Sequence, residues 1–171
     1  MTSTTKDQEK KKILFLCTHN SARSQMAEGL LRHFYGERYE AYSAGVTPTA
    51  VHPLSVRVMA EIGIDISKQT SKGIEEYRGC DFDVVATVCV NTPNLACPFC
   101  SSSELRGERP KIIAETLRNV VFFTEHGFLD PSEVKGGDEE QLKAFRTVRD
   151  EIKKWVIDYF FYPSARAPVT Y

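Results

Sequence analysis

Hydrophobic and polar positions alternate along the chain between two kinds of pattern. Short apolar runs, of the type found in buried strands, occur at residues 12–17, 83–90 and 120–124, and residues 39–44 are interpreted as a further strand that Gly45 closes. Between and after them, apolar residues recur at helical spacing in 21–36, 54–62 and 142–159. This alternation predicts an α/β fold: a single domain with a four-stranded parallel sheet flanked by helices.

The chain ends and one internal stretch lack these patterns. Residues 1–11 are polar and lysine-rich and residues 163–171 have no periodicity, so we expect flexible tails around one domain at 12–162. Residues 91–109 contain two prolines, a glycine and three consecutive serines, which predicts a mobile flap. No element is assigned to the segment 101–117.

Composition excludes several classes of protein. The 171 residues include 22 basic and 23 acidic side chains, so the basic excess of a nucleic-acid binder is missing. No apolar run approaches the ~18 residues of a membrane span, and the first residues lack the apolar core of a secretory signal. The expected compartment is the cytoplasm, where the five cysteines are not expected to form static disulfides.

The first predicted strand runs into Cys17-Thr-His-Asn-Ser-Ala-Arg-Ser24, and a helix follows. Five residues between a cysteine and an arginine can wrap so that their backbone N–H groups point at one centre, and the helix N-terminus adds positive potential there. Arg23 then grips an oxyanion with two parallel hydrogen bonds. The predicted oxyanion cradle consists of Thr18, His19, Asn20, Ser21, Ala22 and Arg23.

Within this loop, Cys17 is the predicted nucleophile at the base of the anion site, and Ser24 is expected to donate its hydroxyl to the thiolate. Asn20 is interpreted as a residue that shapes the loop, and His19 is expected to point outward. The alternative is that Cys17 is an inert buried thiol and Arg23 a surface charge, but this does not account for the surrounding loop.

The segment Cys17-Thr-His-Asn-Ser-Ala-Arg-Ser-Gln-Met-Ala-Glu-Gly29 resembles the anion loop of the low-molecular-weight protein tyrosine phosphatase superfamily, and its second half is more similar to the arsenate reductases of that superfamily. Further motifs similar to those reductases follow in order: Tyr42-Ser-Ala-Gly45 with His52-Pro53, His126-Gly-Phe-Leu-Asp-Pro131, and Phe145-Arg-Thr-Val-Arg-Asp-Glu-Ile152. The resemblance spans about residues 12–158. It implies the phosphatase-like fold and the reduction of arsenate to arsenite, an activity of arsenic detoxification.

The resemblance also implies roles for residues outside the loop. It makes Asp130 the general acid that protonates the departing oxygen. It implies a redox-active disulfide relay, in which Cys17 attacks arsenate, Cys89 displaces arsenite by forming a disulfide with Cys17, and Cys97 moves the disulfide into the flap. Thioredoxin, glutaredoxin or a small thiol would then reduce it. No organic cofactor or resident metal is expected; in some family members the position of Asn20 helps to hold a potassium ion.

Several alternatives stay open from the residues alone. Cys100 forms a CxxC motif with Cys97 and competes with it as the final resolving thiol. Zinc would find three thiolates in Cys89, Cys97 and Cys100 but prefers four ligands, and Cys80 is interpreted as a spare thiol.

The alternative activity is hydrolysis of phosphate monoesters by a low-molecular-weight tyrosine phosphatase, and a third hypothesis is a redox or metal-binding regulator without turnover. Ser132 and Glu133 follow Asp130-Pro131 and offer no ring to stack on an aromatic substrate, which favours a small inorganic anion.

Overall fold

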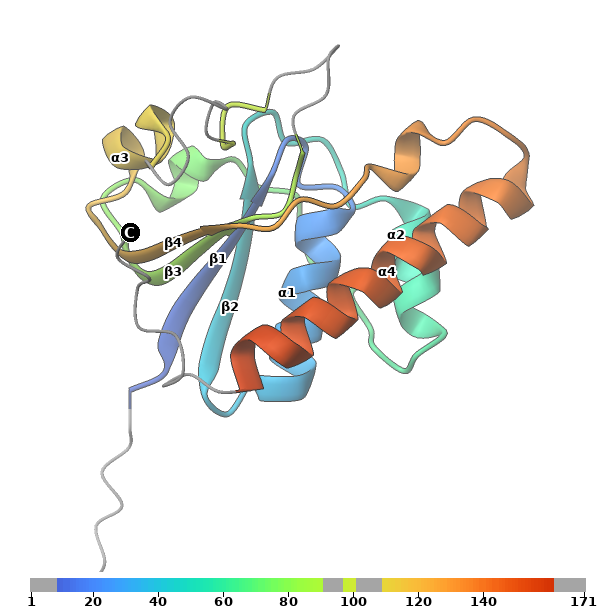
Figure 1. The fold of residues 1–171 in the computed structure, drawn as a ribbon, viewed down its shortest axis with the longest axis horizontal. Helices are drawn as coiled ribbons and strands as arrows, with labels where there is room; N and C mark the ends of the chain where they lie inside the picture. The colour runs from blue at the N-terminus through green and yellow to red at the C-terminus, as the bar shows by residue number, and fades with distance from the viewer. Residues whose placement is uncertain (1–8, 91–96, 101–108, 162–171) are drawn as a thin grey trace, which may run out of the picture.

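The computed structural model describes residues 9–90, 97–100 and 109–161. Its centre is a four-stranded sheet in the order β2-β1-β3-β4, with all neighbouring strands parallel (Figure 1). The strands are β1 (Lys11–Cys17), β2 (Tyr39–Gly45), β3 (Asp81–Thr87) and β4 (Asn119–Glu125). The predicted fold class, a single α/β domain with a four-stranded parallel sheet, is confirmed.

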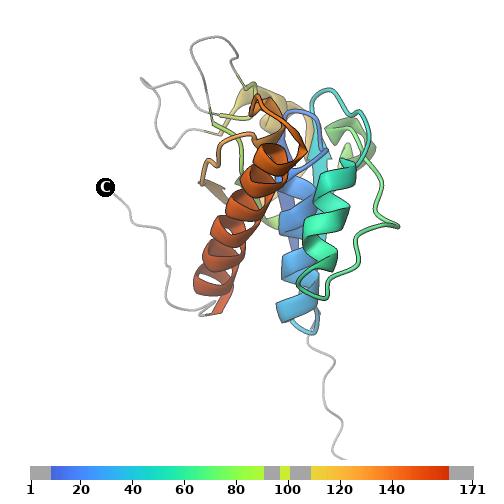
Figure 2. The ribbon, with the colours of Figure 1, turned by 90° about the vertical axis from the view of Figure 1, so that its right-hand side faces the viewer.

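Helices cover both faces of the sheet. The helices are α1 (Arg23–Tyr35), α2 (Pro53–Ala60), α3 (Lys111–Thr116) and α4 (Asp138–Phe161), with short 3-10 turns η1 (Ile74–Tyr77) and η2 (Pro131–Glu133). α1, α2 and α4 lie side by side on one face, and α3 lies with η1 on the other (Figures 1 and 2). This two-sided cover explains why the central strand β1 contains an unbroken apolar run, residues 13–16, that is fully buried.

Several element boundaries differ from those that the hydrophobic pattern predicts. β1 begins at Lys11, inside the expected tail, and α1 begins at Arg23 because the two residues before it remain in the loop. β3 ends at Thr87 instead of Val90, so Cys89 lies beyond the strand. Val88 and Cys89 are buried in the core although they are no longer part of the strand. Because the apolar run continues past Thr87, it does not show where the strand ends.

Two further differences concern helices. α3 lies in the segment to which no element was assigned; it has only six residues, too few to show a helical period, and it buries Ile113. Phe34 continues the apolar spacing of α1 but is 38% exposed. Its ring lies under the ammonium group of Lys153, with Nζ 5.8 Å from the ring centroid.

Parts of the predicted tails and flap, namely 1–8, 91–96, 101–108 and 162–171, lie outside the described residues. Across the described ranges, no helix combines the length and apolar character needed to cross a membrane. The carboxyl ends of all four strands meet at the upper edge of the sheet in Figure 1. Ligand sites of open α/β sheets lie at this edge.

Candidate active site

The loop between β1 and α1 has its carbonyl groups turned outward. They accept hydrogen bonds from the segment that follows β2: from Val46 and Thr47 N–H to Thr18 (2.9 and 3.0 Å), from Thr49 N–H to His19 (3.3 Å), and from His52 N–H to Ser21 (3.0 Å). Because a peptide carbonyl and the N–H of the same peptide unit point in opposite directions, this arrangement turns the loop N–H groups toward its inside. Such a concave run of N–H groups at a helix N-terminus binds anions.

A chain of buried hydrogen bonds leads from Asn20 to the Cys17 sulfur. Asn20 is in the left-handed region, with φ +48°, and its Nδ2 donates to Ser24 Oγ at 2.8 Å. Ser24 Oγ is in turn 2.8 Å from Cys17 Sγ. Since Asn20 supplies the proton for its own contact with Ser24, the Ser24 hydroxyl proton is available to the sulfur, where it stabilises a thiolate.

The hydrogen bonds of the Asn20 side-chain oxygen do not fit a role of this residue in holding a potassium ion. Its Oδ1 accepts hydrogen bonds from Gln25 Nε2 and from the Lys72 backbone N–H, both at 2.8 Å. An amide oxygen has two lone pairs, and both are directed at protein donors. The contacts therefore favour the role of a residue that braces the loop.

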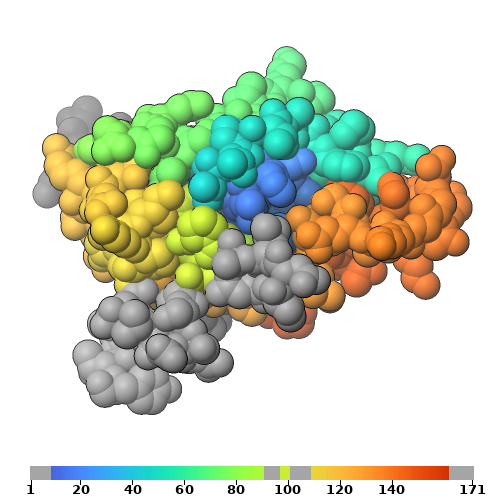
Figure 3. Space-filling model, turned by 90° about the horizontal axis from the view of Figure 1, so that it is seen from above, coloured from blue at the N-terminus to red at the C-terminus, as the bar shows by residue number. Residues whose placement is uncertain are grey.

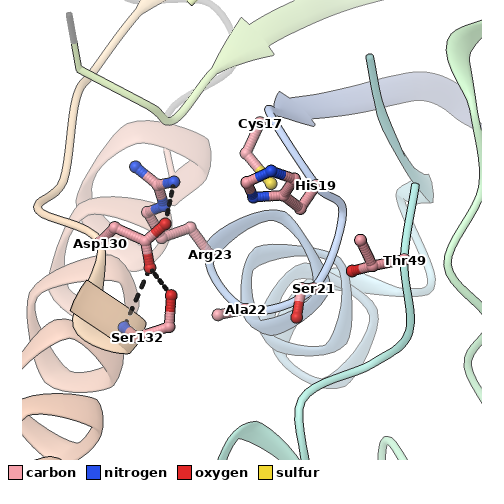
Figure 4. A pocket seen from close by; sticks show the side chains of 8 residues that line it. All are labelled: Cys17, His19, Ser21, Ala22, Arg23, Thr49, Asp130 and Ser132. Carbon is pink, nitrogen blue, oxygen red and sulfur yellow. Dashed lines mark hydrogen bonds and ion pairs between the residues drawn. The ribbon is translucent and has the colours of Figure 1, made fainter. Parts of the chain in front are cut away.

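Arg23 and Asp130 meet across the mouth of the loop, although 107 positions separate them. The guanidinium donates from Nη2 to Asp130 Oδ2 at 2.8 Å and from Nη1 to the carbonyl of Phe128 at 3.1 Å. Asp130 Oδ1 accepts from both the backbone N–H and the hydroxyl of Ser132, at 3.0 and 2.7 Å (Figure 4). One carboxylate oxygen of Asp130 is thus held by the ion pair with Arg23, and the other is held by two hydrogen bonds from Ser132 in the 3-10 turn.

Aromatic packing positions the loop that carries Asp130. His126 stacks on Trp155 of α4, with ring centroids 5.1 Å apart, and Phe128 meets the same indole edge-on at 5.9 Å. The backbone N–H groups of His126 and Phe128 also bond to the carbonyls of Thr87 and Val88. The loop is therefore attached both to the sheet edge and to α4 before it reaches Asp130.

These elements enclose a cavity of about 200 Å³, lined by Cys17, His19, Ser21, Ala22, Arg23, Thr49, Asp130 and Ser132. The expectation that His19 points outward is wrong: its carbonyl is held behind the loop by Ser71 and Thr49, and its imidazole lines the cavity beside Cys17 (Figure 4). From above, the loop lies between the segment after β2 and the segment before α4 (Figure 3).

Thr49 and Ser132 were not predicted as site residues. Nothing in the local sequence marks Thr49, which reaches the cavity through the loop after β2. Ser132 had a usable signal, since an Asp followed by Pro favours a helical turn in which the Asp side chain caps the N–H two residues later.

Three cysteines converge beside the loop. The sulfurs of Cys89, Cys97 and Cys100 all lie within 4.8 Å of one another, and those of Cys89 and Cys100 are 3.5 Å apart. The hydroxyl of Thr18, the neighbour of Cys17, hydrogen-bonds to the sulfur of Cys97. Cys80 is exposed and apart from this group, in agreement with its interpretation as a spare thiol.

The described part of the predicted flap is packed into the core. Phe99 is fully buried between the two cysteines of the CxxC motif, and Cys97 is buried with it. The Cys100 N–H bonds to the Cys97 carbonyl at 3.0 Å, which closes a tight turn. Burial of Phe99, which the polar composition around it did not suggest, brings both sulfurs toward Cys89.

The three thiols polarise one another. Hydrogen bonds with Cys100 and Cys89 lower the pKa of Cys97. Hydrogen bonds with Cys100 and Cys97, together with burial, raise the pKa of Cys89. The pKa of Cys100 is also raised: its hydrogen bond with Cys89 lowers it, but the bond to Cys97 and burial outweigh that effect. Cys97 is therefore the thiol of the three whose pKa is lowered, whereas the pKa values of the other two are raised.

Gly45 at the end of β2 is where the anion loop comes closest to the sheet. A Cβ there would lie 2.7 Å from the Thr18 carbonyl oxygen and 2.8 Å from the Asn20 nitrogen, both backbone atoms. We expect Gly45→Ala to displace the loop and weaken binding of inorganic phosphate about 100-fold, because misplacement by ~1 Å has effects of this size. Titration calorimetry measures the affinity of the variant for inorganic phosphate.

The matched control is Gly73→Ala, since Gly73 pairs with Gly45 in an isolated bridge but a Cβ there meets only Pro48, at 3.6 Å. This variant should bind phosphate like the wild type. Equal affinity in all three proteins would show that the loop tolerates the displacement.

A cysteine at the base of a loop whose N–H groups face inward, with an arginine and an aspartate beside it, is the arrangement expected of an enzyme that attacks tetrahedral oxyanions with a thiolate. The profile of the low molecular weight phosphotyrosine protein phosphatases matches residues 12–165, and the chain belongs to this family.

Individual relatives within the family are reductases. An arsenate reductase of Halalkalibacterium halodurans is 41% identical over 145 residues, which cover 85% of this chain and 91% of the relative. The glutaredoxin arsenate reductase of Synechocystis is 34% identical, covering 85% of this chain and 93% of the relative. A solved arsenate reductase in its reduced state superposes with a TM-score of 0.63 at 32% identity, covering 88% of this chain and 97% of that one.

Proposed function

We propose that this protein is an arsenate reductase, which converts arsenate to arsenite for arsenic detoxification. The observation that carries the proposal is the group of three thiols hydrogen-bonded to the anion loop through Thr18. Hydrolysis of a phosphoester needs only one cysteine, whereas reduction of arsenate needs a second thiol to supply electrons. The similarity to arsenate reductases supports the same conclusion.

In the proposed reaction, the Cys17 thiolate attacks the arsenic atom while arsenate is held by the loop N–H groups and Arg23. Asp130, which takes up a proton when the incoming anion displaces it from Arg23, gives this proton to the oxygen that leaves as water. Cys89 then attacks the sulfur of Cys17, and the electron pair of the sulfur–arsenic bond stays with arsenic, which leaves as arsenite. The two thiols lose the two electrons that arsenic gains, and a Cys17–Cys89 disulfide results.

Cys97 is the proposed final resolving thiol. It attacks Cys89, restores Cys17 and leaves a disulfide in the flap, which an external dithiol such as thioredoxin or glutaredoxin reduces. The sulfurs of Cys100 and Cys89 are 3.5 Å apart, which is close enough for thiol–disulfide exchange, so Cys100 remains the alternative resolving thiol. A relay that starts from free thiols also favours the cytoplasm as the site of action.

Hydrolysis of phosphate monoesters is the second candidate, because Cys17, Arg23 and Asp130 suffice for it. Apart from the imidazole of His19, however, no ring lines the cavity of about 200 Å³ among the described residues. Among the described residues, a phenyl phosphate would therefore find His19 as its one stacking partner, and a small inorganic anion fits better.

The test is arsenite production from arsenate with thioredoxin, thioredoxin reductase and NADPH, with hydrolysis of p-nitrophenyl phosphate measured in parallel. The wild type should form arsenite in proportion to NADPH consumed, and Cys17→Ser should lose both activities. Cys80→Ser, at an exposed thiol outside the site, should keep both. Rapid ester hydrolysis without arsenite, with thioredoxin or glutaredoxin as donor, would identify a phosphatase instead.

A further inference from the structure

The relay described above uses two thiols outside the anion loop, yet three converge. Cys89 lies just beyond β3, Cys97 and Cys100 belong to the buried CxxC turn, and the three sulfurs form one compact triangle. We propose that these three thiols bind trivalent arsenic as a tri-thiolate, so that the enzyme holds the product of its reaction. This inference rests on the proposed function for the identity of the ligand.

The geometry of the triangle suits one small soft ion. All three sulfurs lie within 4.8 Å of one another, so a single atom can contact all of them after small side-chain rotations. Cys89 and Cys97 are buried and Cys100 is half-buried, so the bound ion would be shielded from water. Phe99, fully buried in the same turn, fixes the spacing of Cys97 and Cys100, and thiolates are the ligands that soft ions prefer.

The number of donors distinguishes arsenic from zinc. Trivalent arsenic makes three bonds and carries a lone pair, whereas structural zinc sites take four protein ligands in a tetrahedron. In the described part of the chain, the cluster contains three donor side chains. Glu125 is near enough to act electrostatically on Cys100 but is not one of the converging ligands.

Binding needs no change of oxidation state and no co-reactant. Arsenious acid carries three hydroxyl groups on arsenic. Three arsenic–sulfur bonds form, three arsenic–oxygen bonds break, and the three thiol protons leave with the hydroxyl groups as three water molecules.

The position of the site connects it to the reaction. Thr18 follows Cys17 in the chain and hydrogen-bonds to Cys97, so arsenite leaving the loop emerges next to the three thiols. The same thiols serve the relay, and arsenic bound to them prevents disulfide formation. Accumulated product would therefore slow the enzyme at a site distinct from the one that arsenate occupies.

The test is the mass of the fully reduced full-length protein after incubation with sodium arsenite. The expected gain is one arsenic atom less three hydrogen atoms, and thiol titration should fall from the five free cysteines to two. Cys100→Ser should bind arsenite about 100-fold more weakly, because a third tethered ligand contributes through its effective concentration. Its adduct should keep one hydroxyl group and lose only two hydrogen atoms.

Two further variants separate this site from catalysis. Cys80→Ser and Cys17→Ser should both give the wild-type adduct, although Cys17→Ser cannot reduce arsenate. The inference is overturned if wild type takes up no arsenic, if Cys100→Ser gives the three-thiol mass with unchanged affinity, or if zinc chloride binds and arsenite cannot displace it. Because none of these measurements uses turnover, a failed reductase assay would leave them interpretable.

Discussion

Replacement of Cys89 by serine should abolish arsenite production and leave ester hydrolysis intact. Cys89 is the proposed first thiol of the relay, and without it the adduct on Cys17 has no sulfur to displace arsenite. Cys17, Arg23 and Asp130 are untouched, so p-nitrophenyl phosphate should still be hydrolysed at close to the wild-type rate. Serine retains a hydroxyl that can donate to Cys97, which limits structural damage at this buried position.

The measurement is arsenite formed per enzyme over many turnovers, with Cys80→Ser as the control. Cys80 is a free thiol near the other end of β3 and is exposed, so its replacement tests the loss of a cysteine without touching the cluster. If Cys89→Ser reduces arsenate as fast as the control, the relay starts from another thiol. Cys97 would then be the next candidate, because it contacts Thr18 in the anion loop.

The anion loop could be predicted from the sequence because its chemistry is local. Eight consecutive residues carry the proposed nucleophile, the proposed arginine clamp and the helix start, and the hydrophobic pattern on either side places them at a strand-to-helix turn. The same holds for the order of the elements, since β1, β3 and β4 each contain a compact apolar run. Asp130 could be located only with the family resemblance, because an Asp-Pro pair alone also forms ordinary turns.

What the sequence did not reveal depends on contacts between distant segments. The imidazole of His19 lines the cavity, and Ser71 and Thr49, which are distant in the sequence, hold the backbone carbonyl of that residue. The convergence of the three thiols likewise depends on Phe99, whose burial is decided by the space available in the core. Apolar spacing gives no information on either contact, because both involve single residues in irregular segments.

Replacement of Asp130 by asparagine should slow turnover and at the same time tighten anion binding. In this structure the Asp130 carboxylate is paired with Nη2 of Arg23. The guanidinium of Arg23 is the group that is expected to bind the oxyanion. An incoming anion must therefore compete with Asp130, and a neutral amide removes both the competitor and one negative charge. Loss of the general acid should lower kcat for p-nitrophenyl phosphate by roughly 10²- to 10⁴-fold, whereas phosphate should bind roughly tenfold more tightly, or by about 1.4 kcal/mol.

Ser132→Ala is the matched control for Asp130→Asn. It removes the hydroxyl that donates to Asp130 Oδ1 but keeps the carboxylate and its ion pair with Arg23. Turnover should fall less than in Asp130→Asn, and phosphate affinity measured by titration calorimetry should not increase, because the competing charge is still present. Weaker phosphate binding by Asp130→Asn would contradict this account: Asp130 would then hold Arg23 in position for the anion, and the ion pair would be part of the binding site instead of its competitor.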